Sequence, residues 1–198
     1  MATEKSLTKF AFLAKYKQAV LPGIEFVDAN TVRKSGRVFK VQREVEAMRY
    51  VQSNTSLPVP TILETHLDGE RDARGWILMT KLPGQQLGRC WAAMDAASRA
   101  ETIRQLKLYL DELHRIRLPA PAWIGSCSHG PAYDHRFDNQ TTCGLFGSVG
   151  EFHDFLVAPV RSCPRPDFVD RFRSLLPDDH EIVFCHDDFL GGGVWNPR

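Results

Sequence analysis

A His-x-Asp triplet near the C-terminal end of the chain is the first candidate for chemistry. Residues 184–189 read Phe-Cys-His-Asp-Asp-Phe and follow the apolar run 181–185, so His186 and Asp188 come directly after an expected strand. A strand that ends in polar side chains can hold a carboxylate at a rigid edge, where it could act as a general base. A chain with seven His residues also forms such triplets by chance, so a surface turn is the alternative interpretation.

The composition is that of an ordinary globular protein. The chain has 198 residues, of which 43% are hydrophobic and 25% charged, and its formal net charge is +1. This balance gives no reason to expect a nucleic-acid partner or an acidic membrane surface. No apolar run approaches the roughly 18 residues that a membrane-spanning helix requires. The chain also starts without the basic-then-apolar pattern of a secretory signal.

The cysteines indicate a reducing compartment. There are five of them, an odd number, and no Cys-x-x-Cys pair occurs. Free thiols are therefore expected, as in a cytoplasmic protein. Cys127, His129, His135 and Cys143 form a loose group of potential metal ligands, but their spacing matches no common zinc pattern. We therefore expect no zinc site there.

The first 83 residues predict a small antiparallel sheet with two helices. Apolar residues recur at helical spacing in one set of segments and alternate in another, with Asn, Gly and Pro signals between them. The predicted helices span residues 7–20 and 43–53. The predicted strands span residues 24–27, 31–33, 37–41, 61–66 and 75–80. Pro83-Gly84 closes the last strand, and we place a domain boundary there.

The remainder of the chain is predicted to be mainly helical. Ser98 with Glu101, and Ser148 with Glu151, have the spacing of capping boxes, in which the two side chains satisfy free amides at a helix start. Asp167 is expected to cap a third helix. Residues 118–139 are rich in Pro, Gly and polar residues and predict a loop. A strand is then expected directly before His186.

This order of elements is that of a protein-kinase-like fold. The chain resembles the aminoglycoside phosphotransferase family, which includes choline kinase relatives, and it resembles the family's fungal members most. The similar stretches are Val38–Lys40, Arg43–Val51, Asn54–Pro60, Leu78–Gly84, Ile124–Ser126, Leu176–His180 and Val183–Asp188. The resemblance implies an α+β, two-lobed fold, with an N-terminal lobe of residues 1–83 and an incomplete C-terminal lobe of residues 84–198.

The resemblance also implies a reaction, the transfer of a phosphoryl group from ATP, with Mg²⁺, to a hydroxyl of a small molecule. Lys40 matches the strand lysine that neutralises the nucleotide's phosphates, and Glu44 matches the helix glutamate that pairs with it. Only three residues separate these two, whereas the family usually has a longer link. Lys34 is therefore the second candidate for the lysine, and a solvated lysine and a surface glutamate remain the alternatives.

Further roles follow from the same resemblance. Met79, Lys81 and Leu82 match the connector between the lobes, whose backbone would bind the adenine edge; a plain strand end is the alternative. Asp188 matches the catalytic base, and His186 matches the residue that braces its loop. Asp187 stands where the family commonly has Gly, and a second carboxylate could raise the pKa of the base.

The chain departs from the family pattern where the metal should bind. Gly193 stands five positions after Asp188, where the family has a metal-binding Asn, and Asn196 comes three places late. The chain ends ten residues after Asp188, before the family's metal-binding Asp. Because phosphoryl transfer depends mainly on positioning and on metal-assisted stabilisation of charge, we expect weak or no transfer.

Two other hypotheses stay open on the sequence alone. One is a non-catalytic, pseudokinase-type module that binds a nucleotide or a protein. The other is a non-functional fragment of a longer enzyme. The sequence does not name the acceptor, because family membership does not determine substrate.

Overall fold

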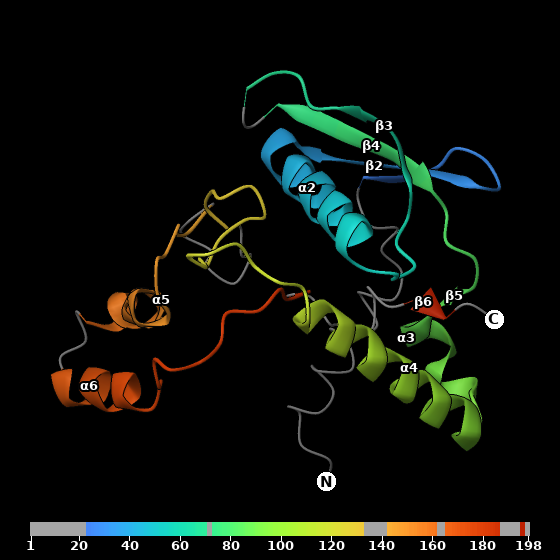
Figure 1. Cartoon of the computed structure of the whole chain (residues 1–198). Helices are drawn as coiled ribbons and strands as arrows, with labels where there is room; N and C mark the ends of the chain where they lie inside the picture. The colour runs from blue at the N-terminus through green and yellow to red at the C-terminus, as the bar shows by residue number, and fades with distance from the viewer. Residues whose placement is uncertain (1–22, 71–72, 133–141, 162–164, 187–194, 197–198) are drawn as a thin grey trace, which may run out of the picture. The chain divides into compact units, whose positions relative to one another are not determined.

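The computed structural model describes residues 23–70, 73–132, 142–161, 165–186 and 195–196. It confirms a mixture of helices and antiparallel sheet (Figure 1). The chain divides into two compact units. The first contains residues 1–41 and 61–81, and the second contains residues 42–60 and 82–198. No helix in the described part of the chain is long and apolar enough to cross a membrane.

The first unit is built on a four-stranded antiparallel sheet in the order β1-β2-β4-β3. Its strands are β1 (Ile24–Phe26), β2 (Thr31–Arg37), β3 (Ile62–His66) and β4 (Arg74–Thr80). Asp28 forms the β1–β2 turn, because its carboxylate accepts hydrogen bonds from the backbone amides of Asn30 and Thr31. Four of the five predicted strands are therefore confirmed, and β2 is longer than the pattern indicated.

The fifth predicted strand, residues 37–41, is wrong. Helix α2 (Val38–Asn54) begins directly after β2, five residues before its predicted start. The amide of Val38 donates to the carbonyl of Ala73, and a Cβ on Gly75 would lie only 3.2 Å from a methyl group of Val38. The first turn of α2 thus packs closely on the sheet where β4 has no side chain, and this packing outweighs the strand preference of Val38-Phe39.

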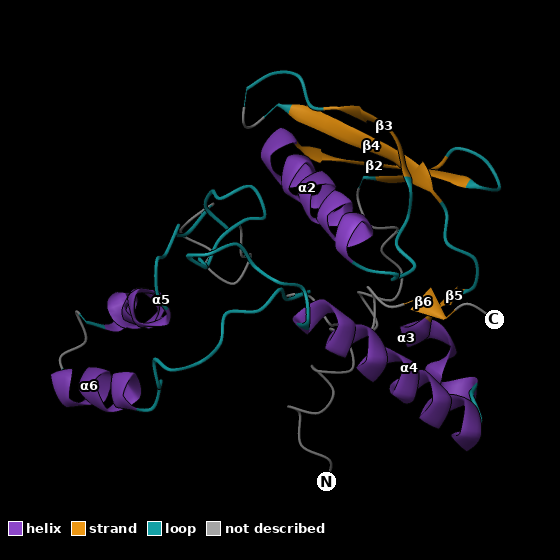
Figure 2. Cartoon of the chain, in the orientation of Figure 1, coloured by secondary structure: helices purple, strands orange, loops and turns teal. Residues whose placement is uncertain are grey.

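Helices supply most of the regular structure of the second unit (Figure 2). They are α3 (Leu87–Cys90), α4 (Ala96–His114), α5 (Val149–Val157) and α6 (Pro166–Ser174), with short 3-10 turns η1 (Trp91–Ala93) and η2 (Ala158–Val160). Two short strands, β5 (Gln85–Gln86) and β6 (Trp195–Asn196), pair antiparallel. Its core contains Val51 on α2 and, at the end of α4, Leu113 and Ile116.

The predicted helix caps are confirmed in one case and wrong in two. Ser148 caps α5, and its hydroxyl accepts a hydrogen bond from the amide of Glu151. Helix α4 is capped by Asp95, which accepts from the amide of Ser98, so Ser98 lies inside the helix. Helix α6 begins at Pro166, and Asp167 lies in its first turn instead of capping it.

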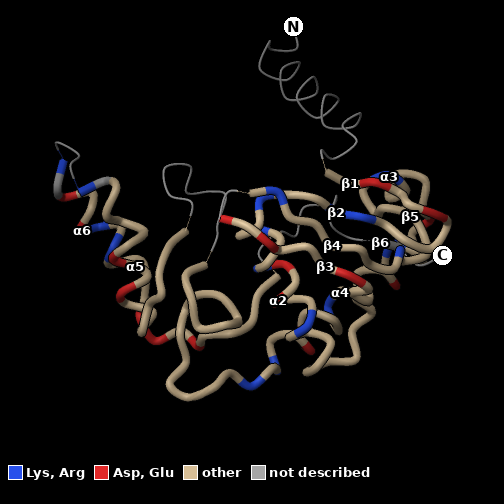
Figure 3. The backbone as a smooth tube through the Cα atoms, turned by 90° about the horizontal axis from the view of Figure 1, so that it is seen from above, with Lys and Arg blue, Asp and Glu red and all other residues tan. Residues whose placement is uncertain are grey.

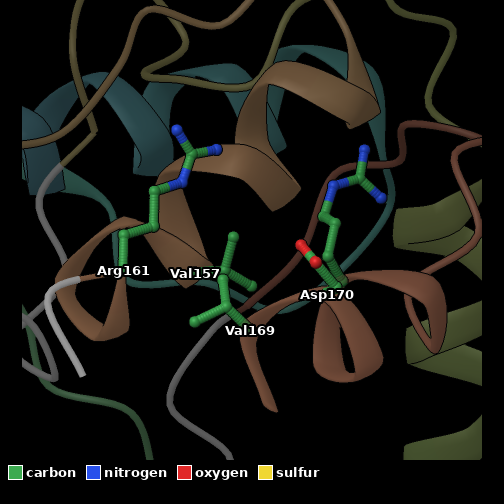
Figure 4. A pocket seen from close by; sticks show the side chains of 5 residues that line it. Val157, Arg161, Val169 and Asp170 are labelled. Atoms are coloured by element: carbon green, nitrogen blue, oxygen red, sulfur yellow. The ribbon is translucent and has the colours of Figure 1, made fainter. Parts of the chain in front are cut away.

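Helices α5 and α6 pack against each other through buried valines. Figure 4 shows Val157 and Val169 side by side, with Arg161 and Asp170 at the edges of a small cavity of about 230 Å³. Charged residues of both signs lie along α5 and α6 (Figure 3), and they include an ion pair between Arg173 and Asp154. The valine contact and the Arg173–Asp154 ion pair together attach α6 to α5.

Two remaining predictions concern the ends of the chain. The strand expected before His186 is wrong, because residues 181–186 are neither strand nor helix. Instead, the side chain of Phe184 packs against the cluster of Val51, Leu113 and Ile116. The predicted helix at residues 7–20 lies outside the described residues.

Candidate functional site

One face of the sheet carries both a lysine and a methionine that the family resemblance singles out. In the β2–β4 ladder, Lys34 lies opposite Ile77 and Val32 lies opposite Met79. Directly opposed residues of an antiparallel ladder point to the same face, so these four side chains share one face. Ile77 is fully buried there, at 0% exposure. Lys34 and Met79 are diagonal neighbours on this partly apolar surface.

The opposite face of the sheet has a structural arginine. Arg33 pairs with Glu25 at 3.3 Å, and its guanidinium lies 5.1 Å from the ring centroid of Trp76. Trp76 in turn stacks on His66. Because Arg33 is held by a carboxylate and an aromatic ring, it stabilises the sheet, whereas Lys34 lies on the same face as Met79.

Helix α2 carries the two other residues of the predicted phosphate site. Lys40 lies in the first turn of the helix and is exposed, so it is not a strand lysine as expected. Glu44 lies one turn later and is half-buried. It follows Val41 by three positions and therefore sits on a neighbouring part of the helix surface. Val41 is buried beside Gly36 of β2.

The connector after β4 is partly occupied by contacts of its own. The amide of Lys81 donates to the carbonyl of Asn30 at 2.7 Å, and its ammonium lies 5.4 Å from the ring centroid of Phe26. Met79, inside β4, and Leu82, after it, are both half-buried. The amide of Lys81 is therefore already used within the sheet, and Met79 is paired there with Val32 and Ile62.

The segment that leads to His186 is anchored by an aromatic stack. The rings of Phe184 and Tyr50 lie 5.7 Å apart and 21° from parallel. Leu57 and Val59 pack on the same core. His186, two residues later, is exposed. Asp187, Asp188 and Gly193 lie outside the described residues, so the role of Asp188 as the base stays a prediction.

The position at which the family binds its metal ion, Gly193, lies outside the described residues. In the described ranges, no group of three His, Cys, Asp or Glu side chains could hold a metal ion. Asn196 lies in β6, where its backbone pairs with Gln85 of β5. Mg²⁺ requires several hard oxygen ligands in near-octahedral geometry. The expected role of Asn196 as a magnesium ligand stays a prediction.

A polar network that the sequence did not predict joins α2 to the loop that follows α4. Nη1 of Arg43 lies 2.7 Å from Oε2 of Glu46, 3.0 Å from Oγ of Ser126 and 2.8 Å from Oγ of Ser128. Ser126 also accepts a hydrogen bond from the amide of Gly130. The Ile124–Ser126 motif thus has a local role, because Ser126 closes a tight turn and fixes it to α2.

A second network surrounds a buried histidine on α5. Nδ1 of His153 lies 2.9 Å from Oδ1 of Asp178, and the other oxygen of Asp178 accepts from Arg173 at 2.6 Å. Arg173 and then His153 hold the pKa of the Asp178 carboxyl below its usual value. Asp178 belongs to the Leu176–His180 motif, which therefore fastens α6 to α5. No spacing rule joins residues 153, 173 and 178 in the sequence.

Arg43 and Ser126 of the first network and His153 of the second line a cavity of about 610 Å³ in the second unit. Arg43, Ala47 and Tyr50 contribute one wall from α2, and residues 123–127 contribute another. Residues 180–185 run along it toward His186. Burial, together with the charge of Glu46, raises the pKa of the Cys127 thiol in this wall. The volume lies within the usual range for small-molecule sites.

Comparisons with known proteins show the family of the chain. A sequence model described as the phosphotransferase enzyme family matches residues 33–192. Among curated proteins, "Clavilactone A biosynthesis cluster protein Y" of Ampulloclitocybe clavipes is 29% identical over 90 residues. That match covers 46% of this chain and 22% of the relative. The chain therefore matches about a fifth of the relative's length.

Proposed function

Because this chain belongs to the phosphotransferase enzyme family, we propose that it binds ATP and transfers the terminal phosphoryl group, slowly, to a hydroxyl of a small molecule. The family match bears out the resemblance to aminoglycoside phosphotransferases and their choline kinase relatives. The kinase-like, two-lobed arrangement and the ATP site itself belong to the proposal.

The observation that carries this proposal is the shared face of Lys34 and Met79. A nucleotide site needs an apolar surface beside the adenine ring and a cation beside the phosphates. Met79 supplies the first and Lys34 supplies the second, two residues apart along one ladder. We therefore assign the phosphate-binding role to Lys34 and not to Lys40, because Lys40 lies on a helix.

Glu44 and Leu82 complete the proposed nucleotide site. Glu44 keeps the role that the family resemblance gives it, that of partner to the phosphate-binding lysine. Leu82 supplies the backbone amide for the adenine edge, since the amide of Lys81 donates to Asn30. Lys81 contributes its carbonyl and keeps its ammonium over Phe26.

Asp188 is the proposed general base. The acceptor's hydroxyl oxygen forms a bond to the γ-phosphorus of ATP, while the bond from that phosphorus to the bridging oxygen breaks. ADP leaves with the bridging oxygen, and the hydroxyl proton passes to the carboxylate of Asp188. The Tyr50–Phe184 stack supports this role, because it fixes the chain four residues before the base.

Slow transfer follows from the residue at position 193. Gly193 has no side chain with which to hold a metal ion, and the family uses an Asn there. Asn196 comes three positions later than the Asn that the family uses. Gly193 also favours a second candidate function, that of a protein that binds a nucleotide without turnover.

A small molecule is the proposed acceptor. The name of the similar protein from Ampulloclitocybe clavipes refers to a biosynthesis cluster, and biosynthetic enzymes act on small molecules. A small-molecule acceptor also agrees with the cavity along residues 180–185, which is large enough for a drug-sized ligand.

Single-turnover phosphoryl transfer tests the proposal. The protein, in excess over γ-labelled ATP, is incubated with a panel of small alcohols and phenols, and labelled product is followed over hours. Transfer should be slow, and Asp188→Asn should reduce it by about 10²–10⁴-fold, the usual contribution of a positioned base. Asp187→Asn is the matched control and should retain most of the rate.

Two results would count against this mechanism. Transfer that Asp188→Asn leaves intact would exclude Asp188 as the base. Binding of ATP without transfer to any acceptor would instead support the non-catalytic nucleotide-binding candidate.

A further inference from the structure

The cavity of the second unit has one buried polar side chain in a mainly apolar wall. Four aromatic rings line it, those of Tyr50, Trp123, Phe152 and Phe184. Among the described lining residues, His153 is the polar side chain that is buried, at 7% exposure. Arg43 and Ser126 also line the cavity, but they are bonded to each other. His153 is therefore the polar group that a buried ligand would meet.

The partner of His153 determines which hydrogen bond the imidazole can offer. Arg173 holds the pKa of the Asp178 carboxyl low, so this group is an ionised carboxylate near neutral pH and accepts hydrogen bonds only. Nδ1 of His153 must then carry the proton that Asp178 accepts. In the neutral ring, Nε2 on the far side is left as an acceptor. No group in the described part of the chain donates to it.

The charge of the lining excludes a strongly cationic ligand. Glu181 is the one carboxylate among the described lining residues, whereas Arg43, His153 and His180 are basic or neutral. A polycation would need several carboxylates to compensate for its lost hydration. A ring-bearing alcohol or phenol fits the aromatic wall and can donate its hydroxyl proton to Nε2.

We infer that this cavity binds the acceptor, that the acceptor is a mainly apolar, ring-bearing alcohol or phenol, and that His153 accepts a hydrogen bond from one of its hydroxyl groups. The inference rests on the proposed function for the identification of the ligand as the acceptor. The described lining of the cavity includes Cys185, which precedes the proposed base Asp188 by three positions in the sequence.

Two related probes test the hydrogen bond. 1-Naphthol has a hydroxyl donor, whereas 1-methoxynaphthalene has the same rings and no donor. Calorimetric titration without nucleotide should show that the unsubstituted protein binds 1-naphthol about tenfold more tightly than 1-methoxynaphthalene. Neamine, a polycationic aminosugar, should not bind.

Two variants separate the role of His153 from a simple loss of packing. His153→Phe keeps a ring and removes both nitrogens, so it should bind the two naphthalenes equally. Asp178→Asn retains the shape of the carboxylate. Its oxygen should stay with Arg173, so its amide would donate to Nδ1 and convert Nε2 into a donor. This variant should lose the preference for the naphthol and gain affinity for the ether.

Controls keep the test decisive. His114→Phe replaces an exposed histidine at the end of α4 and should retain the parental preference. Equal binding of both probes by the parent, or a preference that survives His153→Phe in a folded variant, would overturn the inference, as would tight binding of neamine. Lys34→Met should abolish ATP binding and leave naphthol binding intact, so failure of this inference and failure of the proposed function are distinguishable.

Discussion

Lys34 of β2 and Met79 of β4 are diagonal neighbours on one face of the sheet. Their register follows from the pairs Lys34–Ile77 and Val32–Met79. Diagonal neighbours lie about 7–8 Å apart, close enough for one nucleotide to contact both. The alternation of the strand sends Arg33 to the other face, where Glu25 and Trp76 hold it. The sheet thus separates a structural cation from one that could bind phosphate.

The close contact between α2 and the sheet predicts a large effect at Gly75. A Cβ there would lie 2.7 Å from the carbonyl oxygen of His66 and 3.2 Å from Val38. Gly75→Ala should therefore destabilise the protein by about 1–3 kcal/mol, as overpacking does in other cores. Gly147→Ala is the matched control, because its Cβ would meet only the flexible end of Glu151. Urea unfolding of both variants measures the difference, and equal stabilities would contradict the packing.

Phe184 anchors the segment of residues 181–186, which leads to the proposed base. We therefore predict that Phe184 contributes to both stability and activity. Phe184→Ala removes a partly buried ring from the Val51–Leu113–Ile116 cluster and should cost about 2 kcal/mol. It should also lower phosphoryl transfer at temperatures where the variant is folded, because the segment before His186 loses its anchor. Phe172→Ala, on a ring that is 54% exposed, should change neither quantity appreciably. Activity that persists in the folded Phe184→Ala variant would show that the stack does not position the segment.

The Arg43 network predicts a specific role for Ser126. Ser126→Ala removes the hydroxyl that accepts hydrogen bonds from the amide of Gly130 and from Arg43. The free energy of unfolding should therefore fall by about 1–2 kcal/mol. Ser174→Ala, which removes an exposed hydroxyl bonded to the carbonyl of Arg171, should cost much less. The free energy of unfolding in urea distinguishes them. A Ser126→Ala variant as stable as the control would mean that the network is not needed for the fold.

The Arg173–Asp178–His153 contacts predict an acid-sensitive contribution to stability. A carboxyl whose pKa is lowered on folding binds fewer protons in the folded state than in the unfolded state. The contribution of Asp178 is therefore complete above its usual pKa of 3.8 and is lost as the pH falls through the lower folded value. In Asp178→Asn, the free energy of unfolding should fall less steeply between about pH 4 and pH 2 than in the parent. Asp179→Asn, which keeps both contacts of Asp178, should retain the slope of the unsubstituted protein. The same slope in Asp178→Asn would contradict the prediction.

The sequence predicted the strands well because their boundaries are marked by turn residues. Asp28, Asn30, Asp68 and Gly69 produce local turns, so they act without help from distant residues. The start of α2 was missed because Val38-Phe39-Lys40-Val41 has the composition of a strand. Gly75, 37 residues away from Val38, makes helical packing possible there.

The candidate site was predicted less completely than the fold. The motif residues Glu44, Met79 and Ser126 were identified by resemblance, but the choice of Lys34 over Lys40 required the register of β2. The strand before His186 was wrong because Phe184 packs against the Val51–Leu113–Ile116 cluster, while Ile182 and Val183 line the cavity, and none of the three lies in a strand. The contacts of Arg43 with Ser126 and of His153 with Asp178 join residues that are 83 and 25 positions apart, which no local pattern reveals.

Calorimetric titration of ATP into the parent protein, Lys34→Met and Lys40→Met tests the central claim most directly. The parent should bind ATP, and Lys34→Met should weaken binding at least about tenfold, because a charge-assisted hydrogen bond to phosphate is lost. Lys40→Met should bind within about twofold of the parent, since a surface substitution remote from the ligand has little effect. Equal loss in both variants, loss confined to Lys40→Met, or no ATP binding by the parent would contradict the assignment of the Lys34–Met79 face as the nucleotide site.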